Sequence, residues 1–383
     1  MTPRLLLAGA AVLAVSCIPS PAGAARARSA DRALDRALQR LVVMPDGPPG
    51  AIAVVQRGRR QKVLVAGVAN LASGQQIDAD DHMRLASVSK AFNGAAALSL
   101  VARGVLSLDD TIGERLPALT RAWAPVTLRQ LLNHTSGLPD YLSVPGAQEA
   151  LAASLTRAPP PDQLLAFVAG RDLEFAPGSR YRYSNSDNVA VALMIAAATG
   201  GSYEGALRSE VLEPLRLRDT TLPDGTNMPN PYLHGYDTPG TGAPEDLSEV
   251  VAAGWPWASG GIVSTPRELN RFIRGYVGKR LFSGPTRIEQ MRFDGGGSSE
   301  PPGPGDNAAG LGIFRYRTSC GTVFGHTGNF FGYTQFAAAS GTGDRSATIS
   351  VSTQLRPDLN GKVFAALRRV ENLAICSVLA AGR

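Results

Sequence analysis

The sequence predicts an α/β protein of the α+β type: an antiparallel five-stranded sheet flanked by N- and C-terminal helices, with a large all-helical insertion. Two patterns predict this class. Short apolar segments bounded by turn residues occur near the N-terminus and again in the last third of the chain, as is typical of strands. The middle shows helical patterns between loops rich in Pro and Gly. We therefore expect a sheet domain at 25–80 and 251–383, and a mainly helical domain at 81–250.

The N-terminal part of the sheet domain is predicted as a helix followed by a hairpin. Residues 29–43 place Leu34, Leu38 and Leu41 on one helical face, with arginines opposite. Apolar segments at 51–56 and 62–69 flank a turn, which is the pattern of two paired strands.

The remaining elements follow from apolar runs and turn residues. Thr127 and Thr265 are expected to cap helices, because a threonine before an apolar run is typical of a helix N-terminus. Helices are predicted at 91–105, 127–132, 161–170, 187–199, 204–212, 265–275 and 361–380, and strands at 312–317, 321–325, 333–339 and 347–353. The Gly- and Pro-rich segment 295–306 is expected to be a flexible surface loop.

The composition is that of an ordinary globular protein, with 383 residues, 44% hydrophobic and 18% charged. The net charge is +6, but no run of Lys and Arg exceeds three, so we do not expect nucleic-acid binding. The histidines are far apart in the sequence, and no Cys/His cluster has metal-ligand spacing: His82, His134, His234 and His326. We therefore expect neither a metal nor a cofactor.

The first residues have the pattern of a secretory signal. Arg4 precedes the apolar run 5–18, and Ala22-Gly23-Ala24 offers a small-residue cleavage site. We expect a signal peptide at 1–24, cleavage after Ala24 and a secreted protein without stable membrane insertion. The alternative is a lipoprotein that begins at Cys17.

Removal of the signal leaves Cys320 and Cys376 in an exported chain. An oxidising compartment favours a disulfide between them, and the alternative is two separate buried thiols.

Ser87 and Lys90 stand three residues apart at the start of an apolar, Ala-rich run. If this run is a helix, the hydroxyl and the amine share one face and can meet. An adjacent amine of lowered pKa can take the proton of a serine and make it a nucleophile. The alternative is a helix cap followed by a solvated lysine.

Two further polar signals follow at large separations. Tyr183-x-Asn185 lies in a loop, and His326-Thr327-Gly328 lies at the end of an expected strand. Each has a plain alternative, a packed loop tyrosine and a strand-edge histidine. Three such signals in this order are much less frequent by chance than any one of them.

Together, Ser87-x-x-Lys90, Tyr183-x-Asn185 and His326-Thr327-Gly328 resemble the three motifs of penicillin-recognising serine hydrolases. The likeness is greatest to secreted D-alanyl-D-alanine carboxypeptidases, which are related to class C β-lactamases and to esterases of the same fold. The similarity extends over residues 30–376. It implies a β-lactamase/transpeptidase-like fold with the active site at the junction of the two domains.

The resemblance also implies a role for each matched residue. Ser87 would attack a carbonyl and form an acyl-enzyme, while Lys90 and Tyr183 would share proton handling; which of the two is the base stays open. Asn185 would hold the substrate amide and Lys90. The main-chain N–H groups of Ser87 and Asn329 would form the oxyanion hole.

The third motif is expected to bind substrate. His326 and Thr327 would line the site and help to hold a substrate carboxylate, with Gly328 beside them.

Ser186-Asp187-Asn188 spells the second motif of another branch of these enzymes. Tyr183-x-Asn185 fits better, because it follows a Pro-Gly loop as the resemblance requires. We expect Ser186 and Asp187 to cap a helix instead.

The chain departs from the resemblance at two points. His326 stands where class C β-lactamases usually have Lys, and Phe314 stands where the peptidase pattern favours a cation for the terminal carboxylate of the substrate. Arg315 would point to the opposite face of its strand. Either Arg315 or Arg317 substitutes through a register shift, or the site does not bind a free terminal carboxylate.

From these motifs we expect a monomeric, penicillin-reactive serine hydrolase that cleaves D-alanyl-D-alanine peptides. Its partners would be peptidoglycan stem peptides or related small molecules, with β-lactams as inhibitors or substrates. The alternatives are a class C-like β-lactamase, an esterase on the same fold, and an inactive penicillin-binding module.

Overall fold

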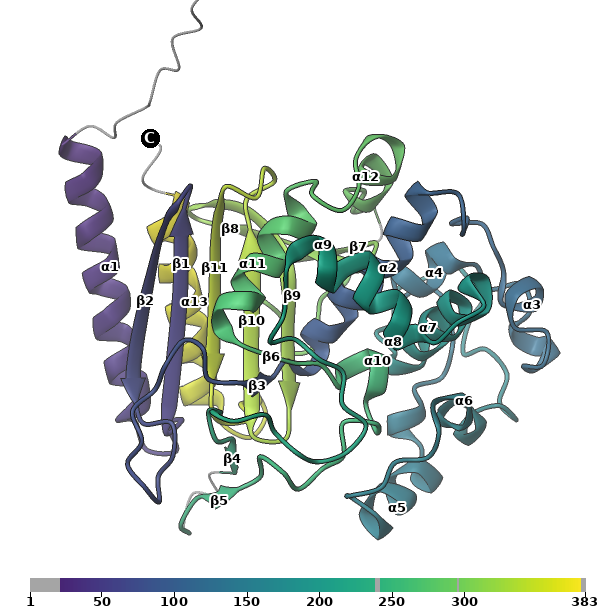
Figure 1. Ribbon diagram of the computed structural model, residues 1–383, viewed down its shortest axis with the longest axis horizontal. Coiled ribbons are helices and arrows are strands. Elements are labelled where there is room, and N and C mark those ends of the chain that lie inside the picture. The colour runs from purple at the N-terminus through teal and green to yellow at the C-terminus, as the bar shows by residue number, and fades with distance from the viewer. Residues whose placement is uncertain (1–20, 238–241, 295, 380–383) are drawn as a thin grey trace, which may run out of the picture.

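The computed structural model describes residues 21–237, 242–294 and 296–379, which form an antiparallel sheet with helices on both faces (Figure 1). The helices are α1 (Pro21–Val42), α2 (Ser89–Ala102), α3 (Ile112–Arg115), α4 (Leu128–Leu132), α5 (Pro145–Ala153), α6 (Pro161–Leu164), α7 (Asn185–Thr199), α8 (Tyr203–Leu207), α9 (Glu213–Leu215), α10 (Trp257–Gly260), α11 (Pro266–Val277), α12 (Gly284–Gln290) and α13 (Gly361–Leu379). Single turns of 3₁₀ or π-helix are η1 (Ala86–Val88), η2 (Arg121–Trp123), η3 (Tyr141–Ser143), η4 (Leu165–Phe167) and η5 (Arg208–Leu212). The apolar signal run at 5–18 and Cys17 lie outside the described residues.

The central sheet has the strand order β2-β1-β11-β10-β9-β8-β7, and every neighbouring pair is antiparallel. Its strands are β1 (Gly50–Arg57), β2 (Arg60–Gly67), β7 (Asp306–Gly310), β8 (Ile313–Thr318), β9 (Gly321–Phe330), β10 (Tyr333–Ala339) and β11 (Arg345–Val351). The fold class is therefore confirmed, but the prediction of five strands is wrong, because the sheet has 7. Both hairpin strands and all four C-terminal segments join it, and β7 adds an edge strand at the end of the expected loop.

Two short sheets lie outside the central one. β3 (Met83–Arg84) pairs with β6 (Val263–Ser264), and β4 (Tyr236–Asp237) pairs with β5 (Glu245–Asp246). The β3–β6 pair matters for the site, because it fixes the chain just before Ser87.

The terminal helices cover one face of the sheet. α1 packs against α13, and both contact the β1 side of the sheet (Figure 1). β1 shows why this face is apolar: Ala53 and Val55 pack with Leu38 of α1, whereas Ile52 and Val54 belong to a cluster on the opposite face. This alternation is the two-residue period of a strand with both faces covered.

The opposite face is covered by α11 and, beyond it, by the helices of the middle of the chain (Figure 1). Asn270 of α11 donates a hydrogen bond to the Val54 carbonyl at 3.1 Å. Phe272 of α11 stacks on Phe92 of α2, with ring centroids 3.5 Å apart. α2 is buried along nearly its whole length, so the helix that follows Ser87 is part of the core.

Helix caps follow the predicted chemistry. Thr127 forms a reciprocal capping box with Gln130, and the Thr265 hydroxyl accepts a hydrogen bond from the Glu268 N–H. Within 21–237, 242–294 and 296–379, no single helix is long and apolar enough to cross a membrane; by length and composition alone, the bent pair Asn185–Thr199 and Tyr203–Leu215 could do so.

In the structure a disulfide joins Cys320, between β8 and β9, to Cys376 of α13, with Cα atoms 5.2 Å apart. This separation lies within the range that disulfides span. The bond closes a loop across a sequence separation of 56 and ties the last helix to the sheet.

Loss of this bond should lower stability. The chain-entropy model gives a loop of this length about 4 kcal/mol, so the Cys376→Ser variant should unfold at a clearly lower urea concentration. Wild type treated with a reductant is the matched control and should unfold at the same concentration as the variant. An unchanged midpoint in both would contradict the pairing.

Candidate active site

Ser87 lies in the tight turn η1, between β3 and α2. Pairing of β3 with β6 and a hydrogen bond from Leu85 N to Ile262 O at 2.9 Å hold the chain before this turn. Ala86 then adopts a φ of 49°, in the left-handed region that non-glycine residues rarely occupy. Ala86 and Val88 are buried, whereas Ser87 is only half-buried. The strained turn therefore exposes one hydroxyl at the end of a core helix.

Ser89 has a different environment from Ser87. Its side chain is fully buried, and its hydroxyl accepts a hydrogen bond from the Ile262 N–H at 3.1 Å. The nearby second serine is therefore used in packing, and only Ser87 is available to a substrate.

Lys90 lies one helical turn after Ser87 and is almost completely buried. Its Nζ lies 3.0 Å from Ser87 Oγ, 2.8 Å from Asn185 Oδ1 and 2.8 Å from the Ser259 carbonyl oxygen. Burial lowers the pKa of Lys90 from 10.5 to about 7. Nearby carboxylates raise this pKa, but their effect is smaller than that of burial. A substantial share of the amine is therefore neutral at neutral pH.

These three contacts fit a neutral amine. An uncharged amine has two N–H donors and one lone pair, while Asn185 Oδ1 and the Ser259 carbonyl can only accept. In the protonated form Lys90 donates to all three oxygens; in the neutral form its two N–H groups can serve Asn185 and Ser259, which leaves the lone pair for the Ser87 hydroxyl. This arrangement can withdraw the serine proton as the nucleophile attacks.

Asn185 begins α7 and is held in one orientation by Asp140. The Asn185 Nδ2 group donates to Asp140 Oδ2 at 2.8 Å, which leaves Oδ1 facing Lys90. Asp140 Oδ1 in turn accepts a hydrogen bond from the Leu142 N–H at 3.0 Å. Asp140 was not predicted from the sequence, because a carboxylate that follows a turn carries no local sign of this role.

Tyr183 completes the group around Ser87. Lys90 Nζ lies 4.9 Å from the centre of the Tyr183 ring. The Tyr183 hydroxyl is buried and has no hydrogen-bond partner of normal geometry among the described residues. Burial raises its pKa well above the usual value, although the nearby Ser87 hydroxyl acts in the opposite direction. At neutral pH the phenol therefore keeps its proton and can donate it.

Behind Tyr183 lies a buried polar cluster. His134 packs 4.6 Å from the Tyr183 ring, and its Nδ1 lies 2.7 Å from Asp187 Oδ2. The Ser136 hydroxyl donates to the other carboxylate oxygen of Asp187. The prediction that Asp187 caps a helix is therefore wrong: the residue at the N-cap is Ser184, and Asp187 orients His134 instead.

Ser186 does not cap the helix either. Its hydroxyl donates to the Pro139 carbonyl at 2.6 Å and accepts from the Tyr141 N–H at 2.9 Å. The Ser-Asp-Asn segment is thus used to attach the start of α7 to the loop that carries Asp140.

The third motif lies on β9, which runs past η1. A Cβ at Gly328 would lie 2.4 Å from Leu85 O and 3.1 Å from Ser87 N, so the strand approaches the serine turn main chain to main chain. Only glycine allows this approach. Asn329 follows on the cavity wall, with its side chain bonded to Leu355 O and Thr334 Oγ1. Asn329 therefore lines the same cavity as Ser87, and the role of its N–H group in an oxyanion hole stays a prediction.

His326 and Thr327 lie beneath the wall rather than on it. His326 is buried, and its ring packs edge-on against Phe314 at 5.0 Å. Burial lowers the pKa of His326 to about 3, so it supplies no positive charge to a substrate carboxylate at neutral pH. The Thr327 hydroxyl donates to the Pro301 carbonyl at 2.7 Å and thereby holds the loop above the strand.

The cavity at Ser87 has a volume of about 420 Å³. It is lined by Ala86, Ser87, Leu142, Tyr183, Asn185, Pro256, Ser259, Gly260, Glu300, Pro301, Pro302, Asn329, Phe330, Gln354, Arg356 and Pro357. Four of the residues predicted from motifs therefore share one wall: Ser87, Tyr183, Asn185 and Asn329. The other lining residues were not predicted as site residues from the sequence.

In the structure, as in the sequence, Phe314 occupies the position where the peptidase pattern favours a cation. Phe314 is buried and packs against the His326 ring. Arg315 faces the other side of β8, where its guanidinium group lies 5.3 Å from the centre of the Phe293 ring. Arg317 is exposed and pairs in register with Thr322. Neither arginine lines the cavity, so no register shift restores a cation for a terminal carboxylate.

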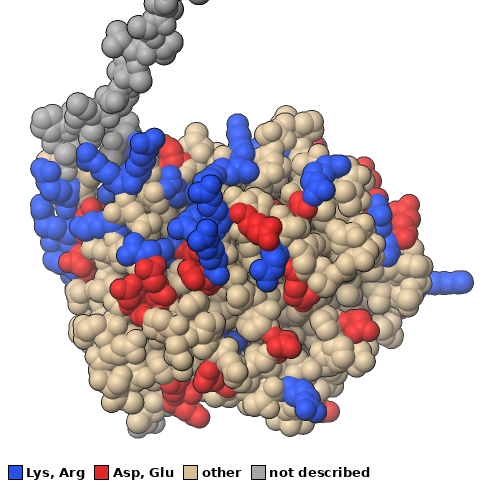
Figure 2. All heavy atoms as spheres, in the orientation of Figure 1, with Lys and Arg blue, Asp and Glu red and all other residues tan. Residues whose placement is uncertain are grey.

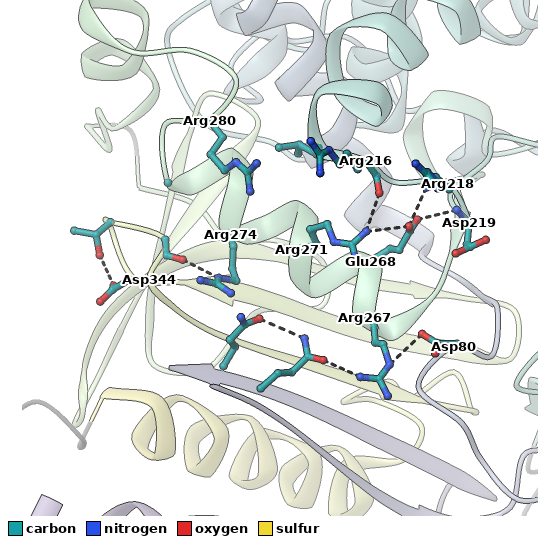
Figure 3. A pocket seen from close by; sticks show the side chains of 16 residues that line it. Asp80, Arg216, Arg218, Asp219, Arg267, Glu268, Arg271, Arg274, Arg280 and Asp344 are labelled. Atoms are coloured by element: carbon teal, nitrogen blue, oxygen red, sulfur yellow. Dashed lines mark hydrogen bonds and ion pairs between the residues drawn. The ribbon is translucent and has the colours of Figure 1, made fainter. Parts of the chain in front are cut away.

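A larger hollow of about 1040 Å³ lies elsewhere and shares no lining residue with the Ser87 cavity (Figure 3). Lys and Arg side chains gather over this part of the surface (Figure 2). Arg267 pairs with Asp80 at 3.0 Å and Arg271 with Glu268 at 3.4 Å. The hollow has no nucleophile beside a buried base, so we place the chemistry at Ser87.

No metal centre was found in the part of the chain that the structure describes, because no group of three or more His, Cys, Asp or Glu side chains could hold an ion.

The half-buried serine, the buried lysine of lowered pKa and the protonated tyrosine lie together beside an antiparallel sheet, which is the arrangement of a serine hydrolase. A sequence profile of the Beta-lactamase family matches residues 34–367. The chain therefore belongs to the beta-lactamase family of serine hydrolases.

Relatives within this family have several named activities. The D-alanyl-D-alanine-carboxypeptidase/endopeptidase AmpH of Escherichia coli is 25% identical over 64% of this chain and 62% of its own length. Esterase EstB of Burkholderia gladioli is 30% identical over 67% of this chain and 73% of its own. A D-aminopeptidase of Cereibacter sphaeroides is 29% identical over 54% of this chain and 39% of its own. The match thus spans less than two thirds of AmpH, and the relatives share no single substrate.

Solved structures give the same fold. A D-stereospecific amidohydrolase from Streptomyces sp. has a TM-score of 0.76 and 30% identity over 88% of this chain and 97% of its own. The D-amino acid amidase of Ochrobactrum anthropi, at 24% identity and a TM-score of 0.77 over 90% of this chain and 98% of its own, supports the fold alone.

The state of Lys90 predicts how activity depends on pH. Below about pH 7 the amine is protonated and has no lone pair for Ser87, so kcat/KM for an uncharged ester should rise with pH and level off above about pH 7. In Lys90→Arg the base stays protonated, and activity should fall by about a hundredfold or more. The pH–rate profile of both proteins checks this. A wild-type inflection that survives in Lys90→Arg would exclude Lys90 as the titrating base.

The close approach of β9 predicts the effect of a single methyl group. Gly328→Ala should displace the Ser87 turn and lower kcat/KM by about a hundredfold, because small errors in the position of a nucleophile have effects of this size. Gly225→Ala is the matched control, since its Cβ meets nothing within 4 Å. Full activity in Gly328→Ala would show that the strand does not position the serine.

Proposed function

We propose that this protein is an exported hydrolase that cleaves amide bonds to D-amino acid residues through an acyl-enzyme on Ser87. Peptides ending in D-alanyl-D-alanine are the substrate type predicted from the motifs. The observation that carries the proposal is the 3.0 Å contact of Lys90 Nζ with Ser87 Oγ, in which both N–H groups of the neutral amine are used elsewhere.

The proposed reaction has two halves. Ser87 Oγ forms a bond to the carbonyl carbon while its proton moves to Lys90 Nζ, and the oxyanion is held by the N–H groups of Ser87 and Asn329. The C–N bond then breaks, and the leaving amine takes a proton from the Tyr183 hydroxyl, which regains one from Lys90. Water next attacks the ester and releases the acid and Ser87.

The named activities of the relatives support a D-configured substrate. AmpH is named for D-alanyl-D-alanine, and other similar proteins are named a D-aminopeptidase and a D-stereospecific amidohydrolase. A D-residue adjoining the cleaved bond is the chemical feature that these names have in common. Export rests on the N-terminal signal pattern and would bring the enzyme to the cell wall, where such residues occur.

An esterase is the second candidate. It is favoured by the similarity to EstB and by the lack, among the described lining residues, of an unpaired cation for a terminal carboxylate. An ester substrate needs no such cation. An inactive penicillin-binding module is less favoured, because binding alone does not require a buried base beside the nucleophile.

A substrate panel separates these candidates. Wild type should release D-alanine from a diacyl-D-alanyl-D-alanine peptide or an amine from D-alanyl amides, and should act far more slowly on the L-enantiomers. Labelled penicillin should mark Ser87 in wild type and in the control Ser89→Ala, but not in Ser87→Ala; mass spectrometry of the labelled peptide gives the position. Turnover of esters without any D-aminoacyl amide would favour the esterase, and full activity in Ser87→Ala would exclude the mechanism.

A further inference from the structure

The loop above the cavity is fixed around Glu300. Ser299 and Pro301 are buried, although the sequence led us to expect a flexible surface loop at 295–306. The Ser299 hydroxyl lies 3.1 Å from the Tyr316 hydroxyl, and Thr327 Oγ1 donates to Pro301 O at 2.7 Å. Just before them, the Tyr181 hydroxyl donates to the Ser298 carbonyl. Glu300 between these attachments is exposed and lines the cavity that contains Ser87.

Glu300 has no partner in the described part of the chain. Its carboxylate makes no hydrogen bond and no ion pair there, whereas the other carboxylate near the site, Asp140, is bound to Asn185 and to the Leu142 N–H. Because Glu300 is exposed, water can solvate its carboxylate until a cation replaces that water. A fixed loop that presents an unpaired carboxylate to the cavity of Ser87 is therefore a candidate binding element.

The cations near Glu300 are already engaged. Arg356, on the same cavity wall, forms a two-point contact with Asp358 at 2.6 and 3.2 Å. Arg182 lies outside the lining and pairs with Glu174 at 2.6 Å. Lys90 is buried and bonded to its three oxygen partners. Among the described lining residues the unneutralised charge is thus negative.

We propose that Glu300 binds the protonated α-amino group of the substrate, so that the enzyme acts on D-aminoacyl amides and peptides whose acyl residue has a free amine. This inference rests on the proposed function and narrows its substrate class: D-alanyl amides with a free amine should react faster than longer peptides ending in D-alanyl-D-alanine, in which the amine of the attacked residue is acylated. The α-amino group is one carbon from the carbonyl that Ser87 attacks, and Ser87 and Glu300 line the same cavity of about 420 Å³. An N-acylated residue would bring a neutral amide to the same carboxylate.

The charge of Glu300 also acts on the base. It is one of the carboxylates that raise the pKa of Lys90, together with Asp140 and Asp187, against the larger effect of burial. A substrate ammonium bound to Glu300 would offset this contribution. Lys90 would then lose its proton more readily when the preferred substrate is in place, which couples recognition of the amine to activation of Ser87.

The test uses two reversible inhibitors that bind serine without turnover: the boronic-acid analogue of D-alanine with a free amine, and its N-acetyl derivative. Inhibition of a chromogenic ester substrate gives Ki for each. Wild type should bind the free amine at least about tenfold more tightly than the N-acetyl compound, as expected for a charge-assisted contact. Glu300→Gln should reduce this ratio to about one.

Asp306→Asn is the matched control, because it removes one negative charge from the exposed end of the same loop. It should keep the wild-type ratio. A wild type that prefers the N-acetyl compound, or a Glu300→Gln variant with an unchanged ratio, would overturn the inference. An equal loss of affinity for both inhibitors in Glu300→Gln would also overturn it, because that result would indicate a general effect on Lys90.

The outcome is separable from that of the proposed function. The inhibitors report on the amine contact even if no D-aminoacyl amide is hydrolysed. An intact free-amine preference without amide turnover would support the role of Glu300 and overturn the proposed reaction. Amide turnover without a preference for the free-amine inhibitor would support the proposed reaction and overturn the role of Glu300.

Discussion

The structure depends on the burial of a single amine. Lys90 is placed in a core helix, where loss of water lowers its pKa to about 7 and makes the neutral form available. In that form Asn185 and the Ser259 carbonyl can use both of its N–H groups, which leaves its lone pair for Ser87. These partners come from α7 and α10, so α2, α7 and α10 must pack together before the serine can be activated.

The elements around the site hold Ser87 in position beside Lys90. The β3–β6 pair and the strained turn at Ala86 fix the nucleophile, while β9 closes the site from the sheet side through Gly328. The disulfide at Cys320 lies at the start of β9 and ties that strand to the last helix. A site assembled from two layers in this way is held by the packing of the helices against the sheet.

Sequence patterns predicted the parts that depend on local chemistry. Thr127, Thr265 and the strand alternation of β1 follow rules of spacing, and the motif residues Ser87, Lys90, Tyr183 and Asn185 do come together. The rest depends on contacts between distant residues. The edge strand β7 has few β-forming residues and is made a strand by pairing with β8, so its sequence resembled a loop. Asp140 and Glu300 carry no local signal, because their roles arise only when separate loops meet at Ser87. The domain boundaries and the individual catalytic roles stay predictions.

The central claim is that burial lowers the pKa of Lys90 to about 7, so that about half of the amine is uncharged at neutral pH, and this pKa can be measured directly. The chain contains only four lysines, Lys62, Lys90, Lys279 and Lys362, so ¹³C labelling of lysine should give few NMR signals. The signal lost in Lys90→Arg identifies Lys90, and its shift can be followed with pH. The account predicts a midpoint near pH 7. A midpoint near 10.5, the ordinary value for lysine, would contradict it.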